Sequence, residues 1–164
     1  MKNNLEFDVE SVLGKTSTDT LIKELASRWP NAESPVLKKR EDVKLLVVDD
    51  DVSTRMILKS ILENLNFKNP NIAEAENGAG AIEKLKNEKY DIIISDWNMP
   101  GITGLSLIKT IKSVPGLKNI PFIMQTALSK KEHVIEAFHA GISGYILKPV
   151  TQQQVEKIIN KLFP

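Results

Sequence analysis

Acidic side chains cluster at the ends of apolar segments in the chain. Asp49 and Asp50 follow the apolar run Leu45–Val48, and Asp96 closes the run that begins at Ile92. Carboxylates that lie close together repel one another, which raises their pKa unless a cation sits among them. A hard divalent cation such as Mg²⁺ takes carboxylate oxygens as ligands and keeps some of its waters. The pattern therefore predicts a magnesium site if the fold brings these segments together.

A hydroxyl and an ammonium group end two further apolar segments. Thr126 follows the segment that starts at Ile120, and Lys148 follows Tyr145–Leu147. A carboxylate can attack phosphorus and form an acyl phosphate. Phosphoryl transfer needs mainly positioning and positive charge near the phosphoryl oxygens. Mg²⁺ and Lys148 could supply that charge, and Thr126 could donate a hydrogen bond to a phosphoryl oxygen.

Each of these residues also has an ordinary structural explanation. An aspartate after a strand often caps the next helix, and for Asp51 this explanation weighs as much as a role in the pocket. Lys148 alone could be a solvated lysine, and Thr126 a plain strand residue. A matched set at the ends of four separate segments favours the functional interpretation.

The elements that must position these residues follow a regular alternation after residue 42. The apolar runs that predict strands are 45–48, 72–75, 92–94, 120–124 and 145–147. Helical patterns separate the runs and close the chain. Five such units predict a parallel sheet covered by helices on both faces, and continuous apolar runs suit strands buried on both sides. Ligands of such sheets bind at the carboxyl ends of the strands, so the side chains named above should converge there.

Composition sets limits on the function. The 164 residues have room for one ordinary domain and an extra arm. The chain has no cysteine, which excludes a disulfide scaffold, a Cys-ligated zinc site and a thiol nucleophile. No stretch approaches the ~20 apolar residues of a membrane span, and the start lacks the apolar core of a signal peptide. A net charge of +1 gives no general attraction to nucleic acid. We therefore expect a soluble cytoplasmic domain with no nucleic-acid partner and no membrane insertion.

Four strings resemble a known family. LLVVDDD, IIISDWNMPGITGL, MQTA and GYILKP are similar to the signatures of response-regulator receiver domains, and most closely to those of the CheY type, which act in chemotaxis. The resemblance covers about residues 43–164 and leaves 1–42 as an N-terminal extension. It implies a flavodoxin-like, doubly wound, five-stranded parallel sheet of order 2-1-3-4-5 with five helices.

The resemblance also implies roles for the clustered residues. Asp96 matches the phosphorylated aspartate of the family, and Lys148 the lysine that contacts the phosphate. Asp50 matches the residue that binds Mg²⁺ directly, and Asp49 its neighbour that acts mainly through water. Asn98 matches the residue whose backbone carbonyl completes the metal site.

A second implied set carries the signal. Thr126 and Tyr145 match the switch pair: the hydroxyl moves toward the phosphate and the aromatic ring turns inward. The face formed by the fourth helix, fifth strand and fifth helix of the domain then changes shape. Lys130 and Lys131 match a lysine pair on that face, where a partner would bind.

Three positions depart from the CheY pattern. Asp51 stands where an aromatic residue is usual, Leu128 replaces an acidic residue at the pocket border, and Ile158 stands where a lysine that faces the motor is expected. These departures leave the lifetime of the phosphoryl group and the flagellar-motor target open. The Lys148–Pro149 bond matches one that is cis in the family.

The function expected from the resemblance is that of a single-domain response regulator. A histidine kinase donates a phosphoryl group to Asp96 in an Mg²⁺-dependent reaction, and the altered face binds a target protein. That target is a flagellar motor switch or another phosphorelay protein, and a phosphatase is a further possible partner. The chain would catalyse only its own phosphorylation and dephosphorylation.

Two alternatives stay open. Asp49–Ser53 also fits the motif of aspartate-nucleophile phosphatases of the haloacid dehalogenase type, with Asp49 as nucleophile and Asp51 as acid/base. The second alternative is a phosphorylation-independent scaffold with a receiver fold.

The N-terminal extension contains one possible short helix, which Thr18 or Asp19 could cap. Its apolar side holds Leu21, Ile22, Leu25 and Trp29, and the proline-containing stretch 30–35 reads as a linker. The segment is either frayed, because so short a helix is marginal in water, or docked on the receiver or on a partner.

Overall fold

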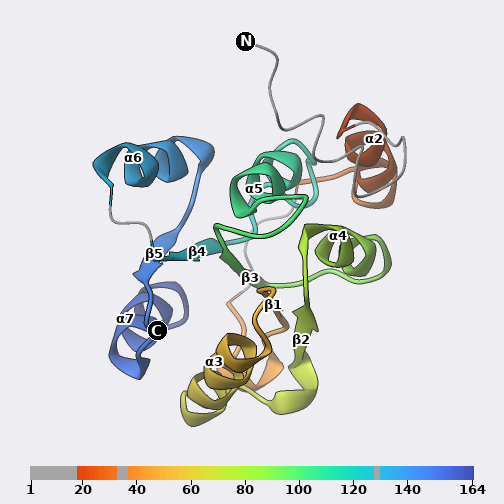
Figure 1. Ribbon diagram of the computed structural model, residues 1–164. Helices are drawn as coiled ribbons and strands as arrows, with labels where there is room; N and C mark the ends of the chain where they lie inside the picture. Colours follow the sequence, from red (N-terminus) through yellow and green to blue (C-terminus); the bar gives the residue numbers. More distant parts are fainter. Residues whose placement is uncertain (1–17, 33–36, 128–129) are drawn as a thin grey trace.

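The computed structural model describes residues 18–32, 37–127 and 130–164. Its centre is a five-stranded sheet of order β2-β1-β3-β4-β5 in which every neighbouring pair is parallel (Figure 1). The strands are β1 (Leu45–Val48), β2 (Ile72–Ala75), β3 (Ile92–Asp96), β4 (Phe122–Thr126) and β5 (Gly144–Leu147). This order confirms the predicted flavodoxin-like topology.

Helices cover both faces of the sheet. They are α3 (Val52–Asn64), α4 (Gly78–Asn87), α5 (Gly104–Lys112), α6 (Lys131–Ala140) and α7 (Gln152–Leu162), with short 3₁₀ turns at Arg40–Asp42 and Asn69–Asn71. In Figure 1, α3 and α7 lie on one side of the sheet and α4, α5 and α6 on the other. Within the described ranges, no helix combines the length and the apolar character that a membrane crossing needs.

The alternation of side chains along each strand divides the core into two parts. Val47, Ile94, Ile123 and Ile146 pack in the cluster that includes buried residues of α3 and α7. Val48, Ile93 and Met124 pack in the cluster that includes buried residues of α4 and α5. The residues of β1 and β3 are all buried, as expected for continuous apolar runs in a sheet covered on both faces.

Strand β4 lies two residues further along the chain than the predicted run 120–124. The Ile120 N–H donates to the Leu117 carbonyl in a turn, and Pro121 has no N–H to give to a ladder. The strand therefore begins at Phe122 and extends to Thr126. This shift brings Gln125 and Thr126 into the regular part of the sheet.

The N-terminal extension contributes a docked helix, α2 (Thr18–Arg28), that packs outside α4 and α5 (Figure 1). Leu21 and Leu25 are buried. Trp29 follows the helix, and its indole N–H donates to the Leu85 carbonyl at 2.7 Å, while the Gly116 N–H donates to the Trp29 carbonyl at 2.9 Å. The apolar side of this helix thus faces the rest of the chain, and a domain boundary at residue 42 stays a prediction.

Candidate functional site

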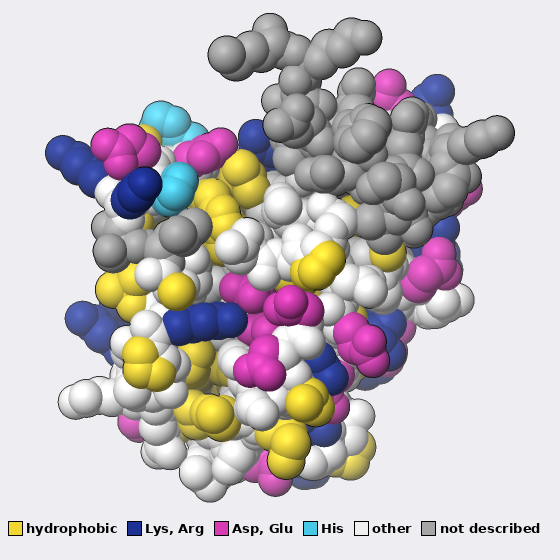
Figure 2. All heavy atoms as spheres, in the orientation of Figure 1, with side chains coloured by type: hydrophobic (Ala, Val, Ile, Leu, Met, Phe, Trp, Pro, Cys, Tyr) yellow, Lys and Arg dark blue, Asp and Glu magenta, His cyan; other side chains and the backbone are white. Residues whose placement is uncertain are grey.

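The carboxyl ends of the strands bring the predicted residues together. Val48 is level with Ser95 and Asp96 with Gln125 in the register of the sheet, so Asp49 follows β1 beside the end of β3. By alternation, Asp49 and Asp96 continue the face that α3 and α7 cover. In Figure 2, acidic side chains gather over the ends of these strands, next to a basic side chain.

Three carboxylates form the centre of the site. Ligand oxygens of Asp49, Asp50 and Asp96 all lie within 4.8 Å of one another. Asp49 and Asp96 are buried, whereas Asp50 is exposed at the rim. Burial raises the pKa of the Asp96 carboxyl, and the charge of Asp49 raises it further, against the opposing effect of Lys148. The cluster therefore favours the entry of a cation.

Lys148 bridges the two buried carboxylates. Its Nζ lies 3.1 Å from Asp49 Oδ2 and 3.2 Å from Asp96 Oδ2. Burial alone would lower the pKa of Lys148, but the hydrogen bond and charge of Asp49 and the charge of Asp96 outweigh it and raise that pKa. The ammonium is therefore held in its charged form beside the predicted phosphate acceptor. The following Lys148–Pro149 bond is cis, as predicted.

The two aspartates that follow β1 differ in their exposure. Asp49 Oδ2 accepts from Gln125 and Lys148, and Asp49 Oδ1 accepts from the Asp51 N–H at 2.8 Å. Asp50, in contrast, is exposed at the rim of the cluster. The division of roles, with Asp50 as the direct ligand of Mg²⁺ and Asp49 acting through water, stays a prediction.

Asn98 lies at the same site through its backbone. Its N–H donates to Asp96 Oδ1 at 3.4 Å. The first residue of α5, Gly104, packs against the end of β3: a Cβ there would lie 2.2 Å from the Asp96 carbonyl oxygen. The loop between Asp96 and Gly104 therefore folds back tightly, and oxygen donors in this set suit a hard cation. The metal role of the Asn98 carbonyl stays a prediction.

Asp51 acts as a helix cap. Its carboxylate accepts from the backbone N–H groups of Ser53 and Thr54 and from the Thr54 hydroxyl. The hydrogen bond from the Thr54 side chain, followed by that from its N–H, lowers the pKa of Asp51. Of the two explanations offered for this residue, the cap accounts for its contacts.

Two residues of the site have no counterpart among the sequence predictions. Gln125 Nε2 donates to Asp49 Oδ2 at 2.8 Å, and Arg55 Nη1 donates to the Asp49 carbonyl at 2.7 Å. Each carried a signal: Gln125 is an amide at the end of a buried strand, and Arg55 shares the buried side of α3 with Leu58 and Leu62. A polar side chain at a buried position needs a partner: Gln125 finds Asp49, and Arg55 finds Asp49 and Glu74.

The predicted switch pair lies on the other face of the sheet. Met124 pairs in register with Tyr145, and Thr126 with Leu147, so the side chains of Thr126 and Tyr145 project toward the α5–α6 side. Thr126 is buried, and Tyr145 is half-buried against the core there. Lys130 and Lys131 are exposed at the start of α6. Leu128 lies outside the described residues.

Trp97 connects the acidic cluster to α6. It directly follows Asp96, is 8% exposed, and its ring centroid lies 5.6 Å from that of His133 on α6. Its backbone N–H donates to the Gln125 carbonyl. Trp97 thus links the end of β3 to α6 by direct contact.

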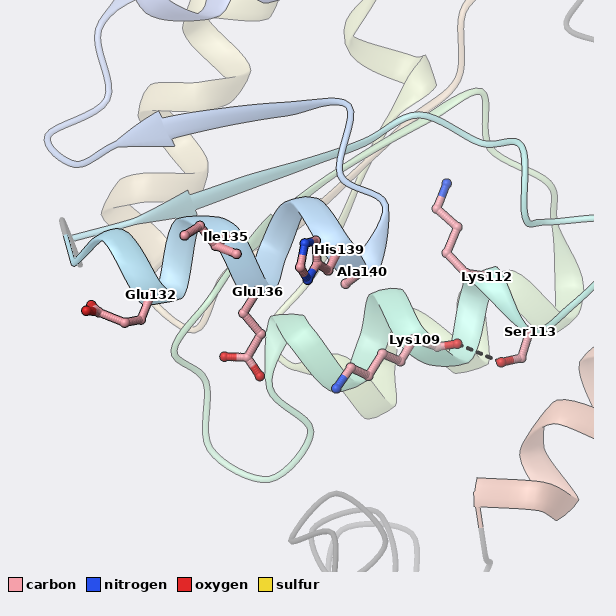
Figure 3. Close-up of a pocket in the computed structure, with 8 residues that line it drawn as sticks. All are labelled: Lys109, Lys112, Ser113, Glu132, Ile135, Glu136, His139 and Ala140. Atoms are coloured by element: carbon pink, nitrogen blue, oxygen red, sulfur yellow. Dashed lines mark hydrogen bonds between the residues drawn. The ribbon is translucent and has the colours of Figure 1, made fainter.

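A surface groove of about 730 Å³ lies between α5 and α6, away from the carboxylates (Figure 3). Figure 3 shows Glu136 and His139 on α6 beside Lys109 and Lys112 on α5, with Ser113 just after the end of α5. The Lys112 ammonium donates to the Lys118 carbonyl, and burial lowers its pKa. None of the predicted site residues lines this groove.

Comparison with known proteins agrees with this geometry. Residues 45–160 match the model of the response regulator receiver domain. The chemotaxis protein CheY of Pseudomonas aeruginosa is 40% identical over 121 residues, which cover 74% of this chain and 96% of that protein. The chemotaxis protein CheY-3 of Vibrio cholerae is 41% identical over 75% of this chain and 93% of its own.

Solved structures show the same fold. The chemotaxis response regulator CheY4 of Vibrio cholerae superposes with a TM-score of 0.66 at 28% identity, covering 73% of this chain and 98% of its own. A receiver domain of a signal transduction histidine kinase from Syntrophus aciditrophicus gives a TM-score of 0.67 at 30% identity, covering 74% and 89%. With its topology, its strand-end carboxylates and these relatives, the chain belongs to the family of response-regulator receiver domains.

Proposed function

We propose that the chain is a phosphorylation-switched response regulator whose acceptor is Asp96. The observation that carries the proposal is the arrangement at the strand ends: three carboxylates within 4.8 Å, with the Lys148 ammonium 3.2 Å from Asp96 Oδ2. A nucleophilic carboxylate, a place for a divalent cation and a fixed positive charge are the parts that phosphoryl transfer requires.

In the proposed reaction, a carboxylate oxygen of Asp96 attacks the phosphorus of a phosphohistidine on a kinase. The new P–O bond forms as the bond between phosphorus and the imidazole nitrogen breaks, and the electron pair returns to that nitrogen. Lys148 stays beside the acceptor and balances the charge of the transferred group. Bound Mg²⁺, held by Asp50, by Asp96 and by the Asn98 carbonyl, with Asp49 acting through water, would neutralise charge on the phosphoryl oxygens.

The proposed output uses the α6–β5–α7 face. A phosphoryl group on Asp96 adds acceptor oxygens, toward which the Thr126 hydroxyl would move, and Tyr145 would then turn inward. The ring contact between Trp97 and His133 supports communication with α6. The exposed Lys130 and Lys131 lie at the start of that helix, where a partner protein could bind.

The proposed setting is two-component signalling in the cytoplasm. A histidine kinase supplies the phosphoryl group, and a target protein or another phosphorelay protein reads the altered face. The names of relatives at 40% and 41% identity favour chemotaxis. Ile158 stands where CheY-type proteins present a lysine, so a flagellar motor switch is the less favoured target.

Phosphoryl mapping tests the acceptor. The full chain, incubated with acetyl phosphate and Mg²⁺, is expected to gain one phosphoryl group by mass spectrometry, and chelation of Mg²⁺ should prevent the gain. Asp96→Asn should abolish labelling, while Asp51→Asn, which keeps the helix cap, should be labelled as the wild type is. Labelling that persists in Asp96→Asn contradicts the proposal, and an unreactive wild type would favour a phosphorylation-independent scaffold.

The phosphatase alternative makes Asp49 the nucleophile and Asp51 the acid/base. The oxygens of Asp49 already accept from Gln125, Lys148 and the Asp51 N–H, and those of Asp51 cap α3. Asp51 is thus engaged as a helix cap, which disfavours it as the acid/base, and Asp49 accepts three hydrogen bonds that hold it in place. Loss of labelling in Asp49→Asn with an intact label in Asp96→Asn would support the phosphatase instead.

A further inference from the structure

Gln125 is a fully buried amide beside the acidic cluster, and the proposed phosphoryl chemistry does not use it. Its exposed fraction is 0%, and it pairs in register with Asp96. Two residues earlier on the same face of β4, Ile123 packs in the apolar core between the sheet, α3 and α7. An amide buried at such a position costs free energy unless both of its polar atoms have partners.

Only one of the two polar atoms of this amide has a hydrogen-bond partner. Nε2 donates to Asp49 Oδ2 at 2.8 Å, whereas Oε1 is buried with no hydrogen-bond partner among the described residues. The orientation of the amide is fixed by chemistry: an ionised carboxylate only accepts, so the –NH₂ group must face Asp49. The carbonyl oxygen is therefore a free acceptor at the same cluster, and an unpaired buried acceptor calls for an explanation.

We propose that Gln125 is a positioning residue for the magnesium site, which rests on the metal-binding part of the proposed function. Its N–H holds the Asp49 carboxylate in place, together with Lys148 and the Asp51 N–H. Its Oε1 would be the acceptor for a water that the bound cation carries. Mg²⁺ keeps several of its waters in proteins, and the groups that hold ligands and waters around a metal strongly affect its affinity.

The competing explanation is that Gln125 only fills space at the end of β4. Methionine separates the two, because it has a similar length and no amide. Met124 is a matched control: it is the neighbouring residue, equally buried, and faces the opposite side of the sheet. Titration calorimetry with MgCl₂ on the unphosphorylated full chain should show about ten-fold weaker binding for Gln125→Met and unchanged binding for Met124→Leu.

Phosphorylation by acetyl phosphate gives a second readout that a packing defect would not reproduce. In Gln125→Met, the Mg²⁺ concentration for half-maximal rate should rise by about the same factor, while the rate at saturating Mg²⁺ stays near that of the wild type. Urea unfolding checks that the variant is folded. If Gln125→Met does not fold, Gln125→Asn replaces it. The shorter side chain moves the amide back by one methylene, and the same loss of Mg²⁺ affinity is expected.

The outcomes separate the two proposals. Wild-type binding of Mg²⁺ with unchanged affinity in the Gln125 variant removes the role of Gln125 and leaves the proposed function intact. A lowered saturating rate with an unchanged Mg²⁺ requirement also overturns the role. A wild type that binds no Mg²⁺ would instead remove the metal site on which the proposed function depends.

Discussion

Asp96 is held in an electrostatically unfavourable place in the absence of a cation. It is buried, it lies beside Asp49, and Lys148 is the counter-charge that the structure provides at hydrogen-bond distance. The raised pKa of its carboxyl means that the folded state favours the neutral form more than the unfolded state does. Ionised Asp96 therefore lowers stability, and a bound cation would reverse the effect.

Removal of this charge should stabilise the apo protein. The carboxyl pKa of Asp96 is higher in the folded state than in the unfolded state. Its stabilising contribution is therefore complete in acid, and it is lost as the pH rises through the pKa of the folded state. Asp96→Asn should thus raise the free energy of unfolding at neutral pH by about 1 kcal/mol, and the difference should disappear in acid. Urea unfolding without Mg²⁺ measures it, and saturating Mg²⁺ should reduce the difference because the cation binds the folded wild type.

Asp51 serves as the control, because its carboxyl pKa is shifted in the direction opposite to that of Asp96. Its pKa is lowered, so its ionised form stabilises the fold, and Asp51→Asn is not expected to raise stability at neutral pH. An Asp96→Asn variant that is less stable than the wild type at neutral pH would contradict the electrostatic account of the cluster.

The ends of the apolar runs indicate which residues share one edge of the sheet, but not every partner within the site. Asp49, Asp96 and Lys148 end separate apolar runs, and the structure joins them by contacts near 3 Å. Gln125 and Arg55 were missed because a single polar residue in an apolar pattern does not say what lies opposite. That information depends on the register of β1, β3 and β4, which no local pattern contains.

At the scale of elements, the docking of α2 shows the same limit. The apolar spacing of Leu21 and Leu25 predicts a helix with one buried side but does not say which surface receives it. The receiving groups include the Leu85 carbonyl and the Gly116 N–H, which are backbone atoms without a sequence signature. Gly116 permits the approach because it has no side chain: a Cβ there would lie 2.6 Å from both the Cβ and the carbonyl oxygen of Trp29.

Gly116→Ala should therefore weaken the docking of α2. The added methyl group must displace the backbone at Trp29, and such overpacking costs about 1–3 kcal/mol in the free energy of unfolding. Gly80→Ala is the matched control, because the nearest atoms to its Cβ lie 3.4 Å and 3.7 Å away and alanine favours the helix. Urea unfolding of both variants is the measurement. Equal stability of Gly116→Ala and the wild type would show that α2 does not pack at this position.

Across the whole molecule, the helices are anchored unequally. All of α6 is described, and Ala137 is its only buried residue, while Ile135 and Phe138 are 44% and 56% exposed. In contrast, α5 buries seven of its nine residues. Helices and strands with few buried apolar contacts unfold locally at a low free-energy cost. The elements that move during function usually belong to this weakly packed class. The weakly anchored helix is also the one that Trp97 contacts through His133.

Hydrogen exchange should reveal this difference. The amides of α6 are expected to exchange roughly ten-fold faster or more than those of α5, because opening α6 exposes little apolar surface. A phosphate mimic such as beryllofluoride, added with Mg²⁺, should change exchange in α6 and β5 and leave α2 unchanged, since α2 docks on α4 and α5. Asp96→Asn, which lacks the acceptor, serves as the control and should show no response to the mimic. A response confined to α3 and α4 would place the output on a different face and overturn the proposed route from Asp96 to α6.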